Sequence, residues 1–153
     1  MSSSSFRNSI TLTAIIFLFS VLSFSAFSQS AVIEKTNDLI TKDGITIASA
    51  LQQCDDLENG ISKEYVVLSV FNENSYPVQV SFKKNLWFDG KCNSCTSNSL
   101  EHIVSLTVAP NEKLEGSCDE NNGLLIFSQM LNLDKVRKLT NYELVDIAVN
   151  EVK

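Results

Sequence analysis

Apolar and polar side chains alternate along most of the chain after residue 44. The stretch YPVQVSFK, residues 76–83, shows this most clearly, because every second side chain from Tyr76 to Phe82 is apolar. Successive side chains of a β-strand point to opposite faces, so a period of two predicts strands with one buried face. Two later stretches repeat the pattern, with apolar stripes at Val104, Leu106 and Val108, and at Val145, Ile147 and Val149.

A second kind of apolar stretch, EYVVLSVF at residues 64–71, is apolar on both faces. Such a pattern is typical of a central strand that is covered on both sides. The turn-rich tetrapeptide NENS separates this stretch from residues 76–83, so we expect the two strands to pair as an antiparallel hairpin. Pro77 lacks a backbone N–H, which places it at a strand start or on a sheet edge.

Turn-forming segments such as APNE and DENNG recur about every ten residues along this part of the chain. Short strands at that spacing predict an all-β fold of roughly six to eight antiparallel strands in two sheets. We therefore expect residues 44–153 to form a single β-sandwich domain, immunoglobulin-like in the broad sense. Residues 29–43 fit neither period, and we assign them to an N-terminal segment that includes a short helix. A single helical turn is expected in NLDKVRKL, residues 132–139.

The first 28 residues have the pattern of a secretory signal peptide. Arg7 precedes an almost wholly apolar run from Ile10 to Phe24, and the small residues Ala26 and Ser28 precede a cut before Gln29. An uncleaved membrane anchor is the weaker alternative, because a span needs about twenty apolar residues. We expect an exported protein in the periplasm, at the cell surface or outside the cell, with no membrane span in the mature chain.

The mature chain would be acidic. Cleavage leaves 153 − 28 = 125 residues, and removing Arg7 leaves 12 − 1 = 11 basic against 18 acidic side chains, a net charge of −7. Such a chain repels phosphate, so we expect neither nucleic acid nor an anionic membrane surface among its partners.

Four cysteines, all in the mature part, predict disulfides in an exported chain. Cys54 and Cys118 are 118 − 54 = 64 residues apart, similar to the spacing that joins the two sheets of immunoglobulin domains. That pairing leaves Cys92 and Cys95 to close a small loop. The similarity stays at the level of the class, because Trp87 lies too far from Cys54 to be the core tryptophan of such a domain. A pairing of Cys54 with Cys92 or Cys95 also remains open.

The segment KCNSC allows two other interpretations. A Cys-x-x-Cys can be a thiol redox couple, but no helix is predicted on which a thiolate could be stabilised. It can also supply half of a metal site, here Cys92 and Cys95 with His102 and Cys118. Oxidation competes for the same thiols outside the cytosol, so we favour structural disulfides and expect no cofactor and no metal.

Adjacent aromatic residues in KKNLWFDG, residues 83–90, form the best candidate for recognition. Trp87 and Phe88 face opposite ways in an extended strand, so one can be buried while the other is exposed beside Lys84. An exposed aromatic there could stack on a sugar ring or anchor a protein partner. The alternative is that both rings pack under the Cys92–Cys95 loop.

No pattern typical of an enzyme is present. His102 is the only histidine, and no nucleophile motif accompanies it. The sequence therefore favours a small, exported, disulfide-stabilised and non-enzymatic binding or structural module.

Overall fold

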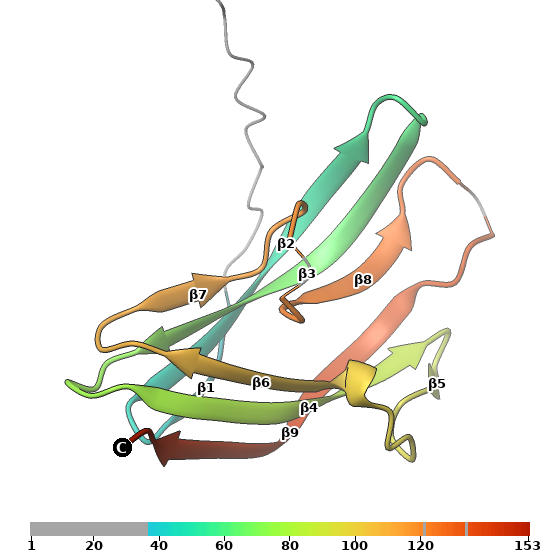
Figure 1. The fold of residues 1–153 in the computed structure, drawn as a ribbon. Coiled ribbons are helices and arrows are strands. Elements are labelled where there is room, and N and C mark those ends of the chain that lie inside the picture. Colours follow the sequence, from blue (N-terminus) through green and yellow to red (C-terminus); the bar gives the residue numbers. More distant parts are fainter. Residues whose placement is uncertain (1–36, 121, 134) are drawn as a thin grey trace, which may run out of the picture. The chain divides into compact units, whose positions relative to one another are not determined.

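The computed structural model describes residues 37–120, 122–133 and 135–153 (Figure 1). The predicted signal peptide, residues 1–28, lies outside the described residues, as do residues 29–36. No helix in the described part is long and apolar enough to cross a membrane. The described elements are β1 (Asn37–Lys42), β2 (Ile45–Asp56), β3 (Ile61–Asn72), β4 (Val78–Phe88), β5 (Lys91–Cys92), the 3-10 helix η2 (Leu100–His102), β6 (Ile103–Val108), β7 (Lys113–Glu115), β8 (Leu125–Met130) and β9 (Leu139–Glu151).

These strands form two antiparallel sheets. The first sheet has the order β1-β2-β3, and β7 and β8 share the remaining edge of β3. In the second sheet, β9 pairs along the whole of one edge of β4, while β6 and β5 pair with successive parts of its other edge. The prediction of an antiparallel all-β fold in two sheets is confirmed. Nine strands are described rather than six to eight, because β1 and β5 were not expected.

The predicted hairpin between residues 64–71 and 76–83 is wrong. β3 and β4 lie in different sheets, and the short connection between them carries the chain from one sheet to the other. The fully buried Asn72 holds this corner, because its amide nitrogen donates to the carbonyl oxygens of Tyr76, Val108 and Ala109 at 3.0 to 3.1 Å. Its Oδ1 accepts the backbone N–H of Asn74 at 3.0 Å. Pro77 lies just before β4, at a strand start as expected.

The N-terminal segment also differs from expectation. Residues 37–42 form strand β1 and not a helix, and β1 pairs with β2 through a tight turn at Asp43 and Gly44. Both turn residues have positive φ, 49° and 72°, which matches the twist of a two-residue hairpin. Among residues 132–139, the described ones are not helical either; the chain forms a loop that leads into β9.

Apolar side chains from both sheets fill the space between them. Inward-facing residues of β3 and β4 are almost completely buried, and strands β2, β6 and β8, together with Leu124 just before β8, contribute the rest of the cluster. Its buried members are Ile45, Ile47, Val66, Leu68, Val70, Val78, Val80, Phe82, Val104, Val108, Leu124 and Ile126. The alternation predicted for residues 76–83 is therefore confirmed, because its apolar positions in β4 are buried in the core.

The apolar stripe predicted for β9 is interrupted. Asp146 has a φ of 55°, and the pairing of β9 with β4 shifts by one residue at this point. A bulge of this kind inverts the faces of the residues on one side of it. Leu144, Ile147 and Val149 pack against the core, whereas Val145 faces away with its partner Lys83.

Polar side chains occupy the other part of the space between the sheets. Tyr142 of β9 donates its hydroxyl to Ser49 Oγ of β2 at 2.9 Å, which links the two sheets directly. Within the first sheet, Ser128 Oγ donates to Glu64 Oε1 at 2.8 Å. One end of the inter-sheet space is thus purely apolar apart from Asn72, and the other is lined partly by hydrogen-bonded polar groups.

Candidate functional site

The register of β4 and β9 gathers polar and aromatic side chains on the outer face of the second sheet. Phe82 and Leu86 of β4 face the core, so the alternate residues Lys83, Asn85 and Trp87 face outward. Across the strand pair, Asn85 lies opposite Glu143, and Trp87 lies opposite Asn141. We call these five residues, Lys83, Asn85, Trp87, Asn141 and Glu143, the Trp87 face.

Trp87 is half-buried and lies at the end of β4 where the chain turns into β5. It pairs with Asn141 on one side and with Cys92 on the other. Thr140 Oγ1 donates to the carbonyl oxygen of Trp87 at 3.2 Å and accepts the N–H of Gly90 at 3.0 Å. The backbone that carries the indole is therefore fixed on both edges.

The segment after β5 covers the edge of β4 beside Trp87. Ser94 is completely buried; its hydroxyl accepts the N–H of Leu86 at 2.8 Å and donates to the carbonyl of Lys84 at 2.9 Å. Asn93 N–H adds a bond to the carbonyl of Leu86 at 2.9 Å. These bonds satisfy the part of the β4 edge that β6 does not reach, so the loop completes the sheet instead of leaving an open edge.

A disulfide between Cys92 and Cys95 closes this loop, with the two Cα atoms 5.8 Å apart. The backbone N–H of Cys95 points at Cys92 Sγ, with N and S 3.1 Å apart. Lys83 Nζ donates to the carbonyl of Cys95 at 3.1 Å, so a side chain of the Trp87 face is tied to the loop. The KCNSC segment is thus a rigid support for one side of the face.

Asn85 gives the Trp87 face an unused hydrogen-bond acceptor. Its Oδ1 is buried, and no donor among the described residues reaches it. A buried carbonyl without a partner costs about 1–3 kcal/mol, so such groups are few in folded proteins. This oxygen is closed to solvent in the structure, so a ligand that brings a hydroxyl or amide donor beside Trp87 would remove this cost only by shifting the side chains that cover Asn85.

Phe88 does not share the Trp87 face, in line with the expectation that the two rings point opposite ways. Its ring stacks on Phe127 of β8, with centroids 6.4 Å apart, and the Arg137 guanidinium carbon lies 4.9 Å from its centroid. Tyr65 packs edge-on against Phe127 at 5.9 Å. Phe88 therefore acts in packing, with partners that the sequence analysis did not single out. Arg137 lies in the segment expected to be helical, so no signal placed it near Phe88.

Lys84 is not at the surface beside an exposed aromatic, and this part of the predicted site is wrong. It lies in phase with Phe82 and Leu86, so alternation points it inward, where it is 6% exposed. Its Nζ donates to the carbonyl oxygen of Gly123 at 2.8 Å. Burial lowers the pKa of Lys84, because the charged amine loses hydration there.

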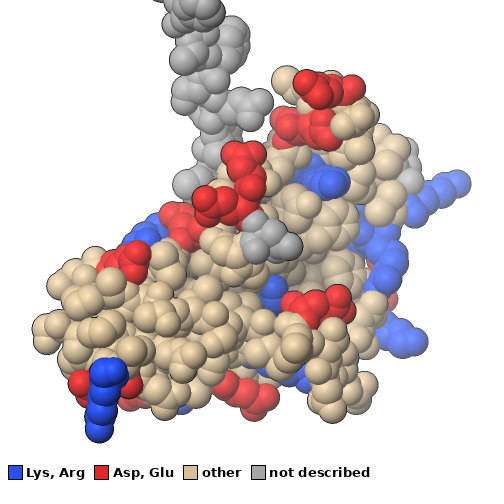
Figure 2. Space-filling model, viewed as in Figure 1, with Lys and Arg blue, Asp and Glu red and all other residues tan. Residues whose placement is uncertain are grey.

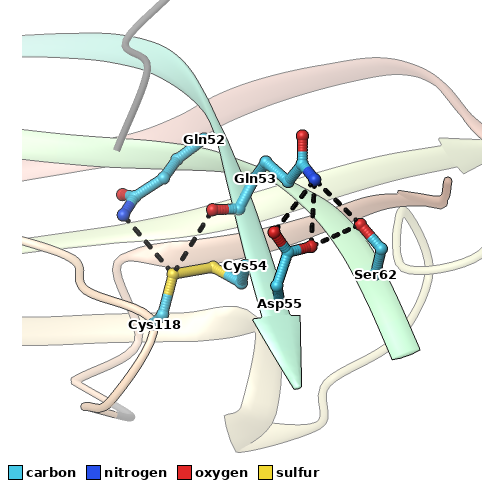
Figure 3. Close-up of a disulfide and its surroundings, with 6 residues drawn as sticks. All are labelled: Gln52, Gln53, Cys54, Asp55, Ser62 and Cys118. Carbon is cyan, nitrogen blue, oxygen red and sulfur yellow. Dashed lines mark hydrogen bonds between the residues drawn. A yellow bond between two sulfur atoms is a disulfide. The ribbon is translucent and has the colours of Figure 1, made fainter. Parts of the chain in front are cut away.

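The second disulfide joins Cys54 of β2 to Cys118 in the segment between β7 and β8, with Cα atoms 5.7 Å apart (Figure 3). Gln52 Nε2 donates to Cys118 Sγ at 3.4 Å. The 3.9 Å approach of the same sulfur to the carbonyl of Gln53 is a packing contact, because a disulfide sulfur carries no hydrogen. The two disulfides follow the pairing that the sequence analysis favoured over a link from Cys54 to Cys92 or Cys95.

Hydrogen bonds order the strand end beside this disulfide. Gln53 Nε2 donates to Asp55 Oδ1 at 2.9 Å, and the hydroxyl of Ser62 donates to the same carboxylate (Figure 3). The bond from Ser62 and then that from Gln53 lower the pKa of Asp55, because both favour its ionised form.

The alternative metal site is not assembled. Cys92 and Cys95 are bonded to each other, and Cys118 is bonded to Cys54, so these sulfurs are not thiolates. His102 is in η2, where its Nε2 lies 3.2 Å from Glu101 Oε1. Within residues 37–153, apart from the two that are not described, no group of three or more His, Cys, Asp or Glu side chains is placed to hold a metal ion.

Comparisons with protein-family models, with curated proteins and with solved structures gave no significant match. The proposed function therefore rests on the two antiparallel sheets and on the Trp87 face.

Proposed function

We propose that this chain is an exported β-sandwich, immunoglobulin-like in the broad sense, that acts as a non-enzymatic binding module. Its ligand surface is the Trp87 face, and its ligand is a carbohydrate. The observation that carries the proposal is the half-buried Trp87 beside Asn85, whose buried Oδ1 has no donor among the described residues.

A sugar fits the chemistry of this face better than an apolar peptide does. Trp87 offers an apolar ring surface on which the C–H face of a pyranose can pack. Asn85, Asn141 and Glu143 supply amide and carboxylate groups around it, and sugar hydroxyls both donate and accept hydrogen bonds. A binding role also suits a rigid sheet face, because fixed groups lose little freedom when a ligand binds.

Export is part of the same proposal. The signal-peptide pattern of residues 1–28 favours it, and the two disulfides are consistent with an oxidising compartment.

The test is retention of the protein on soluble and insoluble polysaccharides, compared between the wild type and Trp87→Ala. A 2 kcal/mol loss at a binding hot spot corresponds to about 30-fold weaker binding, which we expect for the variant. Tyr76→Ala is the matched control, because Tyr76 is an exposed aromatic on the connection before β4 and should not alter binding. Near-UV circular dichroism checks that both variants fold. Failure of a broad polysaccharide panel to retain the wild type, or full binding by Trp87→Ala, would reject the proposal.

One observation supports a second candidate, a thiol–disulfide exchange protein that uses Cys92 and Cys95. The N–H of Cys95 lies 3.1 Å from Cys92 Sγ, where it would stabilise a thiolate after reduction. Thiol titration of protein purified without reductant or chelator, together with metal analysis, separates the candidates. Two free thiols per chain or a bound metal ion would favour the second candidate, and neither would favour the binding module.

A further inference from the structure

Acidic and basic side chains gather at two neighbouring places at one end of the described molecule (Figure 2). The acidic turn consists of Asp55, Asp56, Leu57 and Glu58, at the end of β2 and in the turn to β3. The basic loop consists of Leu131, Leu133, Lys135, Arg137 and Lys138, between β8 and β9. Counting Asp134, which the structure does not describe, the loop has a formal charge of 3 − 1 = +2, on a chain whose net charge is −6.

Hydrogen bonds hold the acidic turn and the basic loop side by side. The N–H of Leu131 donates to the carbonyl of Ser62 at 2.8 Å, just after the turn. Asn132 donates its side-chain amide to the carbonyl of Gly60, the last residue before β3 and two residues after the acidic turn. The acidic turn and the basic loop therefore lie next to each other, not on opposite sides of the described part of the molecule.

Hydrogen bonds hold the two aspartates of the acidic turn, Asp55 and Asp56, and favour their ionised form. Asn59 donates both its side-chain amide, at 2.7 Å, and its backbone N–H, at 3.1 Å, to the carboxylate of Asp56. These bonds lower the pKa of Asp56, as those from Ser62 and Gln53 lower that of Asp55. Because the neighbouring Cys54 is cross-linked to Cys118, the strand end that carries these carboxylates is also anchored covalently.

The basic loop is anchored at its other end. Asp89 N–H donates to the carbonyl of Lys138 at 3.0 Å, and Asp89 Oδ1 accepts the N–H of Lys138 at 3.2 Å. The Arg137 guanidinium carbon lies 4.9 Å from the centroid of the Phe88 ring, so contact with this ring also holds the loop. The ion pairs formed by the described residues are His102–Glu101 and Lys113–Glu115, so among these residues no charge of the acidic turn or the basic loop is used in an ion pair.

Exposed leucines accompany both surfaces. Leu57 in the acidic turn is 79% exposed, and Leu131 and Leu133 in the basic loop are 43% and 52% exposed. They are three of the seven large apolar residues that the described part leaves exposed. Apolar side chains ringed by charges are typical of surfaces that a partner covers.

We infer that this end of the molecule is the interface of a two-fold symmetric homodimer. When a second copy is turned by 180°, its basic loop faces the acidic turn of the first copy, and its acidic turn faces the first copy's basic loop. The contact is then made twice, as in any isologous interface. Adjacent surfaces of opposite charge satisfy this geometry, whereas a growing head-to-tail chain would need them on separate sides. The exposed leucines of the turn and the loop would meet between the charges.

The test is sedimentation velocity of the full chain over a range of protein concentrations, at about 20 mM and at about 500 mM salt. We expect a monomer–dimer equilibrium at low salt that shifts to monomer at high salt. Glu58→Lys and Lys138→Glu should each weaken self-association about tenfold, because each places like charges opposite one another. Their matched controls are Glu151→Lys and Lys153→Glu, which make the same charge changes at exposed positions outside this end.

Mixing the two disruptive variants gives the sharpest result. A mixed dimer keeps one complete pair of charged surfaces, whereas each variant's own dimer has two weakened pairs. The mixture should therefore dimerise more strongly than either variant alone. A monomer at every concentration, a dimer insensitive to salt and to both substitutions, or growth beyond the dimer would each overturn the inference.

Discussion

The two ends of the space between the sheets each bury a polar side chain, and they bury it in different ways. At one end, the amide of Asn72 donates to three backbone carbonyls and its oxygen accepts a backbone N–H. At the other end, Lys84 has a single bond, to the carbonyl of Gly123. A buried polar group stabilises a fold only when its hydrogen bonds are complete, and a buried charge costs free energy unless it is paired.

The surroundings of the two side chains differ accordingly. Around Asn72, side chains such as Val70, Val78 and Val108 are fully buried, so apolar packing closes that end around the hydrogen-bonded amide. Around Lys84, polar groups such as Tyr142 and Ser49 line the sheets, and both disulfides lie beyond it. The two disulfides therefore cross-link the end of the inter-sheet space that contains Lys84, where apolar packing is incomplete. The Trp87 face lies on the outer side of that end.

The largest expected effect separates the two disulfides. Cys54 and Cys118 close a loop of 64 residues, whose loss should lower the free energy of unfolding by about 4 kcal/mol in the chain-entropy model. Cys92 and Cys95 are three residues apart, and the same model gives about 2 kcal/mol for their loss. Guanidinium unfolding of the two double Cys→Ser variants measures this difference. Equal losses would contradict the predicted difference between the long and the short cross-link.

Removing Asn72 tests the apolar end. Asn72→Ala leaves three carbonyl oxygens and the N–H of Asn74 without this partner, so we expect a loss of about 3 kcal/mol in unfolding free energy. Asn150→Ala, at an exposed position near the end of β9, is the control and should change stability by less than about 0.5 kcal/mol. A small loss for Asn72→Ala would mean that packing, not this amide, fixes the corner between the sheets.

Much of the fold could be predicted from the sequence, but the connections that depend on these buried groups could not. Alternation in residues 76–83 correctly placed Val78, Val80 and Phe82 in the core, and the same period extends to Lys84. A turn-rich tetrapeptide is compatible with a hairpin or with a crossover between sheets, and local pattern cannot distinguish them. The bonds of Asn72 to Val108 and Ala109 decide in favour of the crossover, and they join residues more than thirty positions apart.

The candidate site was predictable to a similar degree. Adjacent positions in a strand require Trp87 and Phe88 to face opposite ways, and the structure agrees. The register of β9, which brings Asn141 and Glu143 beside Trp87, depends on strand pairing that no local pattern specifies. The bulge at Asp146 likewise gives no sequence signal, so Val145 was assigned to the wrong face.

The smallest expected effect, and the one that depends on pH, concerns Lys84. Lys84→Met replaces a buried amine with an apolar side chain of similar length, at the cost of the bond to Gly123. We expect the free energy of unfolding at neutral pH to rise by about 1 kcal/mol, because a buried unpaired charge is removed. Lys91→Met is the control, since Lys91 is exposed and should leave stability nearly unchanged. Unfolding of the three proteins in urea gives these differences.

The pH dependence of this difference has a definite sign. Burial lowers the pKa of Lys84 in the folded protein, whereas the unfolded chain has the ordinary lysine value of 10.5. Between the lowered pKa and 10.5 the unfolded chain binds more protons, so the wild type gains stability as pH rises. Below the lowered pKa both states are protonated and the full cost of the buried charge is present. The advantage of Lys84→Met should therefore be greatest at neutral pH and shrink as pH approaches 10.5. An advantage that stays constant with pH would show that the burial of Lys84 carries no electrostatic cost, because the pKa of Lys84 would then be the same in the folded and unfolded states.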